Sequence, residues 1–421
     1  RPGRAAGSAG PAASPTTAPA GAPRSTSAAA APPKASEQRS APSAKALPPP
    51  VGETPPGKKS PAIFANVGTH SGVGGATLFP VVQGVQVWVQ HINARGGLNG
   101  HEVKLILFDD GGDPARHRAQ VQEAIERHKA IAFLGNTEVL SGRGSVEYLT
   151  QKRVPVVGMD TGEPWAYQSP MYFPQSSAGD ALTYTFVASI AQLMVPAGKK
   201  KLGTLVCAEA QICTDADRIF GDNAPKLGFD HVYRAKASLT QPDFTAECLA
   251  ARNAGVEVFF IMLVTNTTQR AAASCARQGY RPNFATASAI VADRLKDDPN
   301  FDGLVAPSQV FPWYQTGTPA TDEYQQAMRT FGKDVAPGAA PPVGWAAGKL
   351  MERAAANLPE PPTSAAILEG LWALKADTLG GITAPLTFVR DQPPTPVSCW
   401  FNMAIRDGAW VSPDGFRMHC R

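Results

Sequence analysis

Two adjacent carboxylates and a few scattered histidines are the residues of this chain most suited to chemistry. Asp109 and Asp110 follow an apolar run, and paired carboxylates can act as a general acid and a general base. A solvated strand end or a helix cap explains the pair as well, and we prefer that interpretation. His117 and His128 lie on a polar helical pattern, so we expect both side chains to be solvated.

Motifs that hold cofactors or activate nucleophiles are missing from the sequence. Gly72-Val-Gly74-Gly75 lacks the spacing of a dinucleotide loop, and neither a Walker A motif nor HExxH occurs. Ser141 has Val139 two residues before it, where a nucleophile elbow carries glycine. We therefore expect no catalytic residue, no cofactor and no metal ion, although dispersed residues can also form an active site.

Charge is unevenly divided along the 421 residues. Residues 1–60 contain 8 Lys or Arg and 2 Asp or Glu. Residues 61–421 therefore contain 31 Lys or Arg and 33 Asp or Glu. The main part of the chain is therefore nearly neutral and has no basic stripe interleaved with aromatic residues. Nucleic acid is not an expected partner.

Residues 1–60 consist largely of Ala, Pro, Ser, Gly and Thr, which predicts a disordered linker. The segment lacks the apolar core of a signal peptide and the length of apolar chain that crosses a bilayer. Because the sequence begins with Arg, we expect that a leader has been removed or omitted. The linker would then tether the protein to the outer face of the cell membrane. The alternative is an extension introduced by cloning or gene prediction.

Six cysteines occur without zinc-site spacing, which fits structural disulfides in an oxidising compartment. They are Cys207, Cys213, Cys248, Cys275, Cys399 and Cys420. Proximity favours Cys207–Cys213 and Cys399–Cys420, leaving Cys248–Cys275, but six cysteines allow fifteen pairings. Six reduced thiols in a cytosolic protein are the alternative.

From residue 61 onward, strand patterns alternate with helical patterns. The expected strands are Ile63–Gly68, Val103–Phe108, Ala130–Leu134, Val156–Val157, Lys201–Val206, His231–Ala235, Val256–Leu263 and Leu304–Pro307. The expected helices are Gly84–Asn93, Pro114–Lys129, Gly142–Lys152, Ala178–Met194, Ala216–Leu227, Phe244–Ala254, Thr268–Gln278, Thr321–Phe331, Val343–Asn357 and Ala365–Leu374. The alternation occurs twice, so we predict an α/β fold of two doubly wound lobes with parallel sheets.

Local signals add detail to this pattern. Gly96-Gly97 should end a helix at Ala94 by supplying positive φ, and Asp113-Pro114 should begin the next as N-cap and first helical residue. Between them, the apolar run Val103–Phe108 is typical of a strand buried on both faces. The last segment, Leu386–Arg421, has the turn signals of a β-hairpin region.

The loops after the predicted strands are small and polar. They include Thr69–Thr77, Gly135–Ser141 and Gly158–Gly162. In parallel sheets ligands bind beyond the carboxyl ends of the strands, so a ligand site is expected where these loops meet.

Residues 63–135 resemble the leucine/isoleucine/valine-binding family of type I periplasmic binding proteins, which serve ABC importers. INARGGLNGHEVKLILFDDGGDP, residues 92–114, is similar to the family signature INxxGGINGxxVxLxxxDDxxDP. The later stretch 239–284, beginning LTQPDFTAECLAARNAGVEVFFIMLV, resembles the second-lobe pattern. The resemblance covers residues 61–345 clearly and the remainder loosely. It implies two lobes joined by three crossings, with hinge closure around one small ligand.

The resemblance also implies a division of the chain. Lobe 1 would comprise residues 61–175 plus 308–385, and lobe 2 residues 176–307 plus 386–421. The crossings would lie near Pro174-Gln175, Ala306-Pro307 and Ala384-Pro385. Proline suits these positions because it limits the torsions that change during closure.

Ligand residues can be carried over position by position. Amino-acid-binding members hold the ligand carboxylate with first-lobe hydroxyls and amides, at positions that correspond to Asn136, Thr137, Glu138, Ser141, Asp160, Thr161 and Gly162. Thr77 stands where such members often have a large aromatic residue. On the second lobe, Ser288 stands where such members have an acid that binds the ammonium group. Ile212 stands where they have an aromatic residue that closes the pocket. Thr265 and Asn266 lie on a neighbouring loop.

The missing acid bears on the ligand, because an unpaired buried ammonium group costs several kcal/mol. Either Glu138 or Asp160 supplies the charge, or the ligand is not an α-amino acid. Asp160 would also repel a ligand carboxylate, so we expect a small polar or amphipathic solute. The predicted function is a monomeric, extracytoplasmic solute-binding protein that delivers this small molecule to the membrane permease of an ABC importer. A ligand-sensing domain and, more remotely, a hydrolase with catalytic groups in the cleft are the alternatives.

Overall fold

The computed structural model describes residues 59–158 and 162–421. The linker predicted for residues 1–60 lies almost entirely outside this part of the chain, and so do the predicted ligand residues Asp160 and Thr161. The described strands are β1 (Ala62–Gly68), β2 (Val103–Asp109), β3 (Ala132–Leu134), β4 (Val156–Val157), β5 (Tyr172–Phe173), β6 (Lys201–Cys207), β7 (Asp230–Ala237), β8 (Val258–Met262), β9 (Asn283–Thr286), β10 (Val305–Ser308), β11 (Cys399–Arg406), β12 (Ala409–Val411) and β13 (Met418–Cys420).

The described α-helices are α1 (Gly72–Ala94), α2 (Pro114–Glu126), α3 (Val146–Lys152), α4 (Gly179–Met194), α5 (Gln211–Asn223), α6 (Thr245–Asn253), α7 (Thr265–Arg277), α8 (Pro319–Phe331), α9 (Ala340–Ala354) and α10 (Ser364–Ala373). Two short 3-10 helices bear on the site: η1 (Gly142–Ser145) precedes α3, and η4 (Ser288–Ile290) follows β9. Among the described helices, none has the length and apolarity needed to span a membrane.

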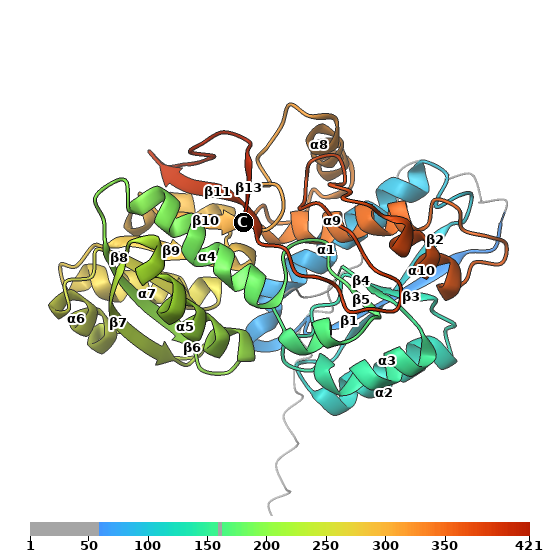
Figure 1. Ribbon diagram of the computed structural model, residues 1–421, viewed down its shortest axis with the longest axis horizontal. Coiled ribbons are helices and arrows are strands. Elements are labelled where there is room, and N and C mark those ends of the chain that lie inside the picture. The colour runs from blue at the N-terminus through green and yellow to red at the C-terminus, as the bar shows by residue number, and fades with distance from the viewer. Residues whose placement is uncertain (1–58, 159–161) are drawn as a thin grey trace, which may run out of the picture. The chain divides into compact units, whose positions relative to one another are not determined.

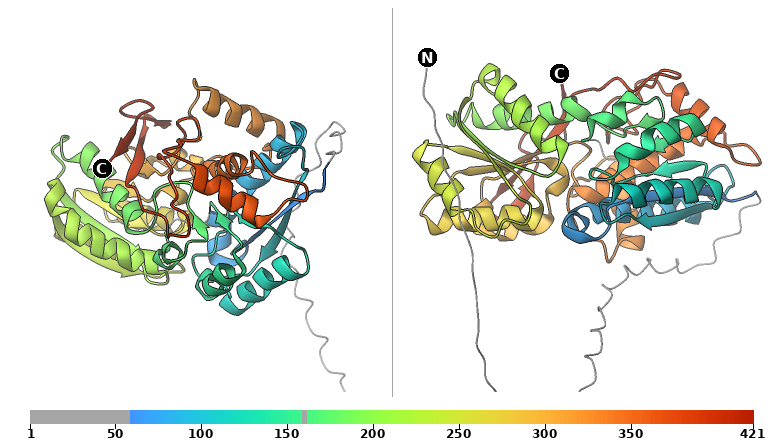
Figure 2. Two further views of the ribbon diagram at one scale, coloured as in Figure 1. Left: turned by 45° about the vertical axis from the view of Figure 1, so that its right-hand side comes forward. Right: turned by 90° about the horizontal axis from the view of Figure 1, so that it is seen from below.

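The strands form two sheets, each between layers of helices (Figures 1 and 2). The first sheet has the order β2-β1-β3-β4-β5 and is parallel throughout. The second has the order β7-β6-β8-β9-β10-β11-β12; it is parallel from β7 to β10 and antiparallel beyond, where β13 also pairs with β11. These are the two doubly wound lobes that the sequence predicts.

Each lobe is built from helices on both faces of its sheet. In the first, α1 and α9 lie together on one face and α2 and α3 cover the other; in the second, α4 and α5 lie opposite α6 and α7 (Figure 1). We call the first sheet with α1–α3 and α8–α10 the first lobe, and the second sheet with α4–α7 the second lobe. We propose the lobe boundaries that the sequence predicts, with Ser308 moved to the second lobe because it pairs with Phe401 in the second sheet.

Hydrogen bonds link the three segments that join the lobes. The Ser176 hydroxyl donates to Gln309 Oε1 at 3.0 Å, and Phe311 N donates to Ile382 O at 2.9 Å. The Thr383 hydroxyl donates to Gln175 O, which ties the first crossing to the third. Ala306-Pro307, predicted as a hinge point, instead lies inside β10, so the second crossing starts after Ser308.

Several local predictions are confirmed. Helix α1 ends at Ala94, and Gly96 and Gly97 follow with φ of 97° and 77°. Asp113 caps α2 by accepting a hydrogen bond from Arg116 N, with Pro114 as the first helical residue. The C-terminal segment forms the β11–β12 hairpin. All three favoured disulfides are present: Cys207–Cys213, Cys248–Cys275 and Cys399–Cys420.

Three element predictions are wrong. Helix α1 begins at Gly72 rather than Gly84, because the first N–H groups of a helix need no internal partner and so tolerate a glycine-rich start. A Cβ at Gly75 would collide with the carbonyl group of His70, so a small residue is required there. Helix α5 likewise starts at Gln211 instead of Ala216. Strand β2 is an edge strand with half-exposed side chains, not one buried on both faces.

Helices α1 and α9 approach each other through glycine, which gives the first testable prediction. A Cβ at Gly344 would overlap the backbone oxygen of Val81, an atom that cannot rotate away. We expect Gly344→Ala to lower the free energy of unfolding by about 1–3 kcal/mol, measured by urea denaturation. Gly144→Ala is the matched control, since a Cβ there meets no atom within 4 Å. Equal stability of the two variants would contradict this account of the helix contact.

Candidate functional site

A cavity of about 160 Å³ lies between the lobes. From the first lobe it is lined by Gly74, Thr77, Leu78, Val81, Asn136, Thr137, Val139, Leu140, Gly162 and Val343. From the second lobe and its crossings it is lined by Leu182, Phe186, Cys207, Ala210, Ile212, Cys213, Leu239, Met262, Leu263, Val264, Ala287, Ser288, Ala289, Ile290 and Gln309. Most of these residues directly follow the carboxyl end of a strand or lie in the first turns of a helix, where ligands bind in parallel sheets.

Six of the predicted ligand residues line this cavity: Thr77, Asn136, Thr137, Gly162, Ile212 and Ser288. Thr265 and Asn266 do not, although both line an adjoining cavity of about 120 Å³ that shares Thr77 and Ile290 with the first. The Thr265 hydroxyl donates to Ile290 O at 2.7 Å, and Asn266 Oδ1 accepts from Arg294 at 2.7 Å. Both side chains are therefore engaged within the second lobe.

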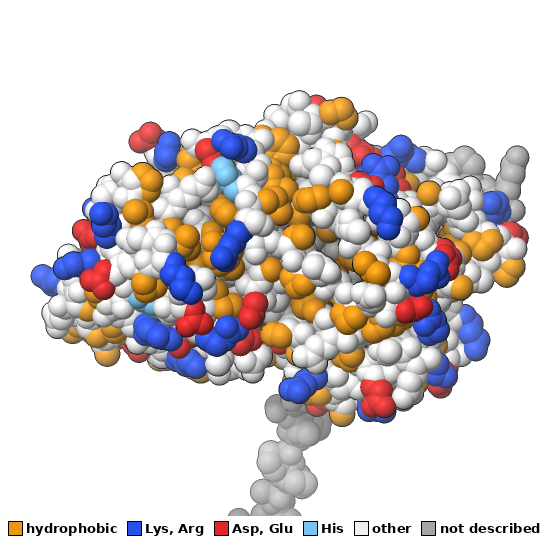
Figure 3. Space-filling view, in the orientation of Figure 1, with side chains coloured by type: hydrophobic (Ala, Val, Ile, Leu, Met, Phe, Trp, Pro, Cys, Tyr) orange, Lys and Arg blue, Asp and Glu red, His pale blue; other side chains and the backbone are white. Residues whose placement is uncertain are grey.

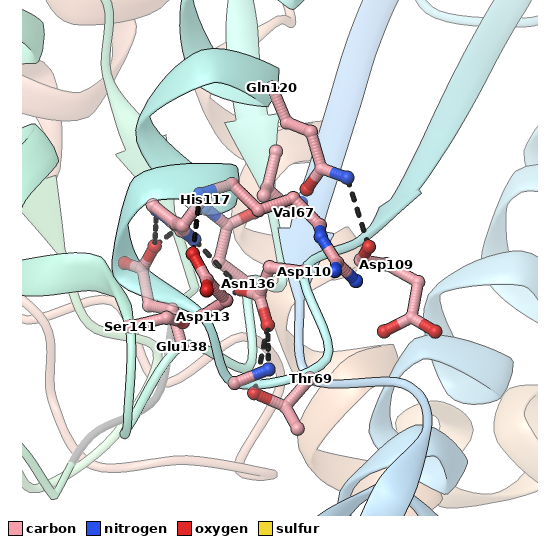
Figure 4. A network of polar contacts seen from close by, with 12 residues as sticks. Val67, Thr69, Asp109, Asp110, Asp113, His117, Gln120, Asn136, Glu138 and Ser141 are labelled. Atoms are coloured by element: carbon pink, nitrogen blue, oxygen red, sulfur yellow. Dashed lines mark hydrogen bonds and ion pairs between the residues drawn. The ribbon is translucent and has the colours of Figure 1, made fainter.

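Glu138 and Ser141, also predicted as ligand residues, do not line the cavity. Both are buried behind it, in a polar network beneath the loop after β3 (Figure 4). The Ser141 hydroxyl donates to Asp110 Oδ2 at 2.7 Å, and Glu138 Oε2 lies 3.0 Å from His117 Nε2. In this structure both side chains hold the loop after β3 in place.

The centre of this network is the imidazole of His117, which is fully buried between two carboxylates. Its Nδ1 lies 2.9 Å from Asp110 Oδ2, opposite the contact with Glu138. Burial alone would lower the pKa of His117, but polar contacts with Asp110 and Glu138, together with their negative charges, raise it to about 9. The ring is therefore an imidazolium at neutral pH. Its Nδ1 is hydrogen-bonded to Asp110, and its Nε2 lies within ion-pair distance of Glu138 without the geometry of a hydrogen bond.

Asp110 is held from several elements at once. Its Oδ1 accepts from the Thr69 hydroxyl at 3.0 Å and from Gly112 N at 2.7 Å, while Oδ2 faces His117 and Ser141. Desolvation would raise the pKa of Asp110, but these hydrogen bonds and the charge of His117 lower it. The expectation of a solvated His117 and a solvated Asp110 is therefore wrong. Asp109 and His128 do reach solvent, the latter in contact with Glu123.

The network extends to the wall of the cavity through Asn136. Its Oδ1 accepts from Val67 N at 3.1 Å, and its Nδ2 donates to Glu138 Oε2 at 3.2 Å. In β1, Asn66 Nδ2 donates to the carbonyl groups of Leu134 and Gly135 at 2.8 and 2.7 Å. The loop after β3 is thus fixed to β1, and the amide of Asn136 is occupied by the scaffold.

Three residues of the described wall carry hydroxyl groups. Thr77 and Thr137 come from the first lobe and Ser288 from the second. Within the described residues, the Thr137 hydroxyl is buried and has no hydrogen-bond partner. Neither Thr77 nor Ser288 donates a side-chain hydrogen bond to any described residue.

Ionisable groups are absent from the described part of the cavity wall. Across the described ranges, no group of three or more His, Cys, Asp or Glu could hold a metal ion. On the face drawn in Figure 3, basic and acidic side chains are interspersed. The arrangement suits non-covalent binding of a small molecule through apolar contact and hydrogen bonds to hydroxyls.

The sequence of this chain matches the family model described as periplasmic binding protein over residues 64–409. The chain belongs to the periplasmic binding protein family. Members of this family act outside the cytoplasm, in agreement with the three disulfides. A curated relative, the amino acid binding protein of Pseudomonas aeruginosa, is 30% identical over 74 residues, which is 18% of this chain and 20% of that protein. The chain therefore matches only about one fifth of the length of that relative.

Solved structures of periplasmic binding proteins share the fold at low sequence identity. A possible leucine/isoleucine/valine-binding protein from Rhodopirellula baltica has a TM-score of 0.71 and 18% identity, covering 86% of this chain and 98% of its own. A branched-chain amino acid transporter substrate-binding protein from Streptococcus pneumoniae was solved in complex with isoleucine. It has a TM-score of 0.69 and 13% identity, and the match covers 86% of this chain and 99% of that protein. An ABC transporter solute-binding protein from R. palustris was solved in complex with benzoate. It has a TM-score of 0.67 and 14% identity, and the match covers 84% of this chain and 95% of that protein.

Some residues of the cavity wall of this periplasmic binding protein escaped the sequence analysis. Leu182 and Phe186 lie one turn apart on α4, and Val343 lies on α9. All three look like ordinary core residues of helices in the sequence. A sequence signal existed only for Cys207 and Cys213, whose short separation predicts the disulfide that joins the end of β6 to the first turn of α5, next to Ile212.

The His117 network predicts how stability depends on pH. Because the folded-state pKa, about 9, exceeds the ordinary value of 6.5, the stabilisation is complete below pH 6.5 and is lost as pH rises through 9. We expect the difference in free energy of unfolding between the wild type and His117→Gln to shrink by up to about 3 kcal/mol between pH 6.5 and 9. Urea denaturation at several pH values measures it. His128→Gln, at a half-exposed histidine outside the network, is the matched substitution. A pH-independent difference for His117→Gln would refute the charged network.

The disulfides should have separable roles. In the loop-entropy model, Cys207–Cys213 contributes about 2 kcal/mol and Cys248–Cys275 about 3.5 kcal/mol, because they close loops with sequence separations of 6 and 27. Only the first lines the cavity. We expect Cys207→Ala/Cys213→Ala to speed amide hydrogen exchange at residues 208–213 at a small cost in stability. Cys248→Ala/Cys275→Ala, the control, should cost more stability and leave that exchange unchanged. The reverse pattern would show that the cavity loop does not depend on its disulfide.

Proposed function

We propose that this periplasmic binding protein captures a small molecule between its two lobes and delivers it to the membrane permease of an ABC importer of the branched-chain amino acid type. The observation that supports the proposal is the cavity itself, whose wall combines strand-end loops of both sheets. A ligand there contacts Thr137 of the first lobe and Ser288 of the second at the same time. Its binding energy therefore favours the closed arrangement over an open one.

The three crossings fit such a motion. Hydrogen bonds between Ser176 and Gln309, between Thr383 and Gln175, and between Phe311 and Ile382 join them to one another. Opening requires torsional changes in a few residues at the ends of elements, while each lobe keeps its own core. An importer could then distinguish the closed, loaded protein from the open one by the relative position of its lobes.

The names of the structural neighbours are consistent with this role, and their ligands differ. The protein from Streptococcus pneumoniae was solved with isoleucine, and the protein from R. palustris with benzoate. We carry over to this chain the delivery of a small molecule to a transporter, but neither ligand. We further propose that the N-terminal segment tethers the protein to the outer face of the cell membrane, and that it acts as a monomer.

A ligand screen followed by an uptake assay tests the proposal. In a thermal-shift screen of amino acids, carboxylic acids and neutral apolar compounds, we expect at least one compound to stabilise the protein, by about 2.7 kcal/mol at a hundredfold excess over Kd. Cells that lack the gene should lose uptake of that compound. The wild type should restore uptake, and Ser288→Arg, which fills the cavity, should not.

Ser288→Ala is the matched control, because it keeps the cavity open and should restore most of the uptake. Normal uptake in the deleted strain, together with intact ligand binding by the purified protein, would overturn the transport role and favour a sensor. Absence of binding by every compound in the screen would contradict a solute-binding function altogether.

A further inference from the structure

The cavity wall indicates the class of ligand. We infer that this protein binds a small molecule with an apolar body about the size of a six-membered ring, one oxygen-containing polar group, and no ammonium group. The inference rests on the proposed solute-binding function and adds the chemistry of the solute. It follows from the apolar wall, the position of the Glu138 carboxylate, the hydroxyl groups of the wall and the volume of the cavity.

Apolar side chains from both lobes form most of the wall. Leu78 and Leu140 come from the first lobe, and Phe186, Ile212 and Met262 from the second. A ligand gains free energy here in proportion to the apolar area that it removes from water. A strongly hydrated group placed against these side chains would lose its water without replacement. The body of the ligand is therefore apolar.

An ammonium group has no charged partner in the described wall. Aspartate and glutamate are absent from the lining residues that the structure describes. Glu138 directly follows the lining residues Asn136 and Thr137, but it is fully buried and does not line the cavity. Its carboxylate lies against His117 and accepts a hydrogen bond from the side-chain amide of Asn136. Among the described residues, none would supply a counter-charge to a cation in the cavity, which opposes its binding.

Hydroxyl groups supply the polar contacts instead. The hydroxyls of Thr77, Thr137 and Ser288 make no side-chain hydrogen bond to the described residues, and that of Thr137 is buried. A hydroxyl can donate to a carbonyl, hydroxyl or carboxylate oxygen, so the wall can hold an oxygen group without a charged side chain. The Thr137 hydroxyl is packed against Gly68, so the hydroxyls of Thr77 and Ser288 are the ones placed to contact a ligand.

The volume limits the size of the body. A cavity of 150 Å³ lined by Leu, Ile and Phe binds benzene, and the cavity between these lobes measures about 160 Å³. One ring or a branched chain of about six carbons therefore fills it. A long alkyl chain or a fused ring system exceeds it.

Calorimetry with compounds of one carbon skeleton tests the inference on the intact protein. L-leucine, 4-methylpentanoate and 4-methylpentanamide share the same branched chain, but leucine alone carries an ammonium group. We expect 4-methylpentanoate or 4-methylpentanamide to bind at least tenfold more tightly than leucine. Tighter binding of leucine would overturn the inference and leave the proposed function intact. Failure of all three to bind at millimolar concentration would also overturn it, whereas the proposed function fails only if the wider screen yields no ligand.

A change of preference by substitution sharpens the test. Ser288→Asp adds a carboxylate to the second-lobe wall and should improve the affinity for leucine, relative to 4-methylpentanoate, at least tenfold. Ser288→Asn is the control of similar size without charge, and it should keep the wild-type preference. If Ser288→Asp has the thermal stability of Ser288→Asn and an unchanged preference, the ligand does not contact this part of the wall, and the inference is wrong.

Discussion

Every strand of a parallel sheet ends at the same edge, and this constraint determines where the two lobes can hold a ligand. The loops after β3, β6, β8, β9 and β10 all follow carboxyl ends, and residues from each of them line one cavity. Helices α1 and α4 begin at the same edges and contribute Thr77 and Leu182. Because each sheet offers a single loop edge, the two lobes form a shared site only by facing each other with those edges.

A loop at such an edge has no strand partners of its own and needs another source of order. In the first lobe that source is a buried charge network, in which the His117 imidazolium joins Asp110 on the β2–α2 turn to Glu138 on the loop after β3. Charged groups of this kind are costly to bury unless paired, so all three must be placed together. Polar groups therefore hold the loop on the side away from the cavity, and the side that lines the cavity stays largely apolar.

Sequence reasoning succeeded where the signal is local. The Gly96-Gly97 cap, the Asp113-Pro114 helix start and the disulfide between Cys207 and Cys213 each depend on residues close together in the chain. It failed where a side chain is positioned by distant elements. His117 lies on a polar helix and looks solvated, but its partners Asp110 and Glu138 stand seven residues before it and twenty-one after it. Likewise, no local pattern tells whether Glu138 points toward the cavity, as Thr137 next to it lines the wall and Glu138 does not.

The separation between scaffold and cavity wall also explains how one fold can serve ligands of different charge. Neighbours with 13–14% identity keep the fold closely, although one was solved with isoleucine and another with benzoate. In this chain the scaffold contacts of Asn66, Asn136 and His117 hold the first-lobe loops without involving the second lobe. Ser288 and Ile212, in contrast, lie on second-lobe segments that support no strand pairing of the first lobe. A substitution at either position changes the cavity wall while leaving the buried network intact, so the wall can vary without loss of the first-lobe loop geometry.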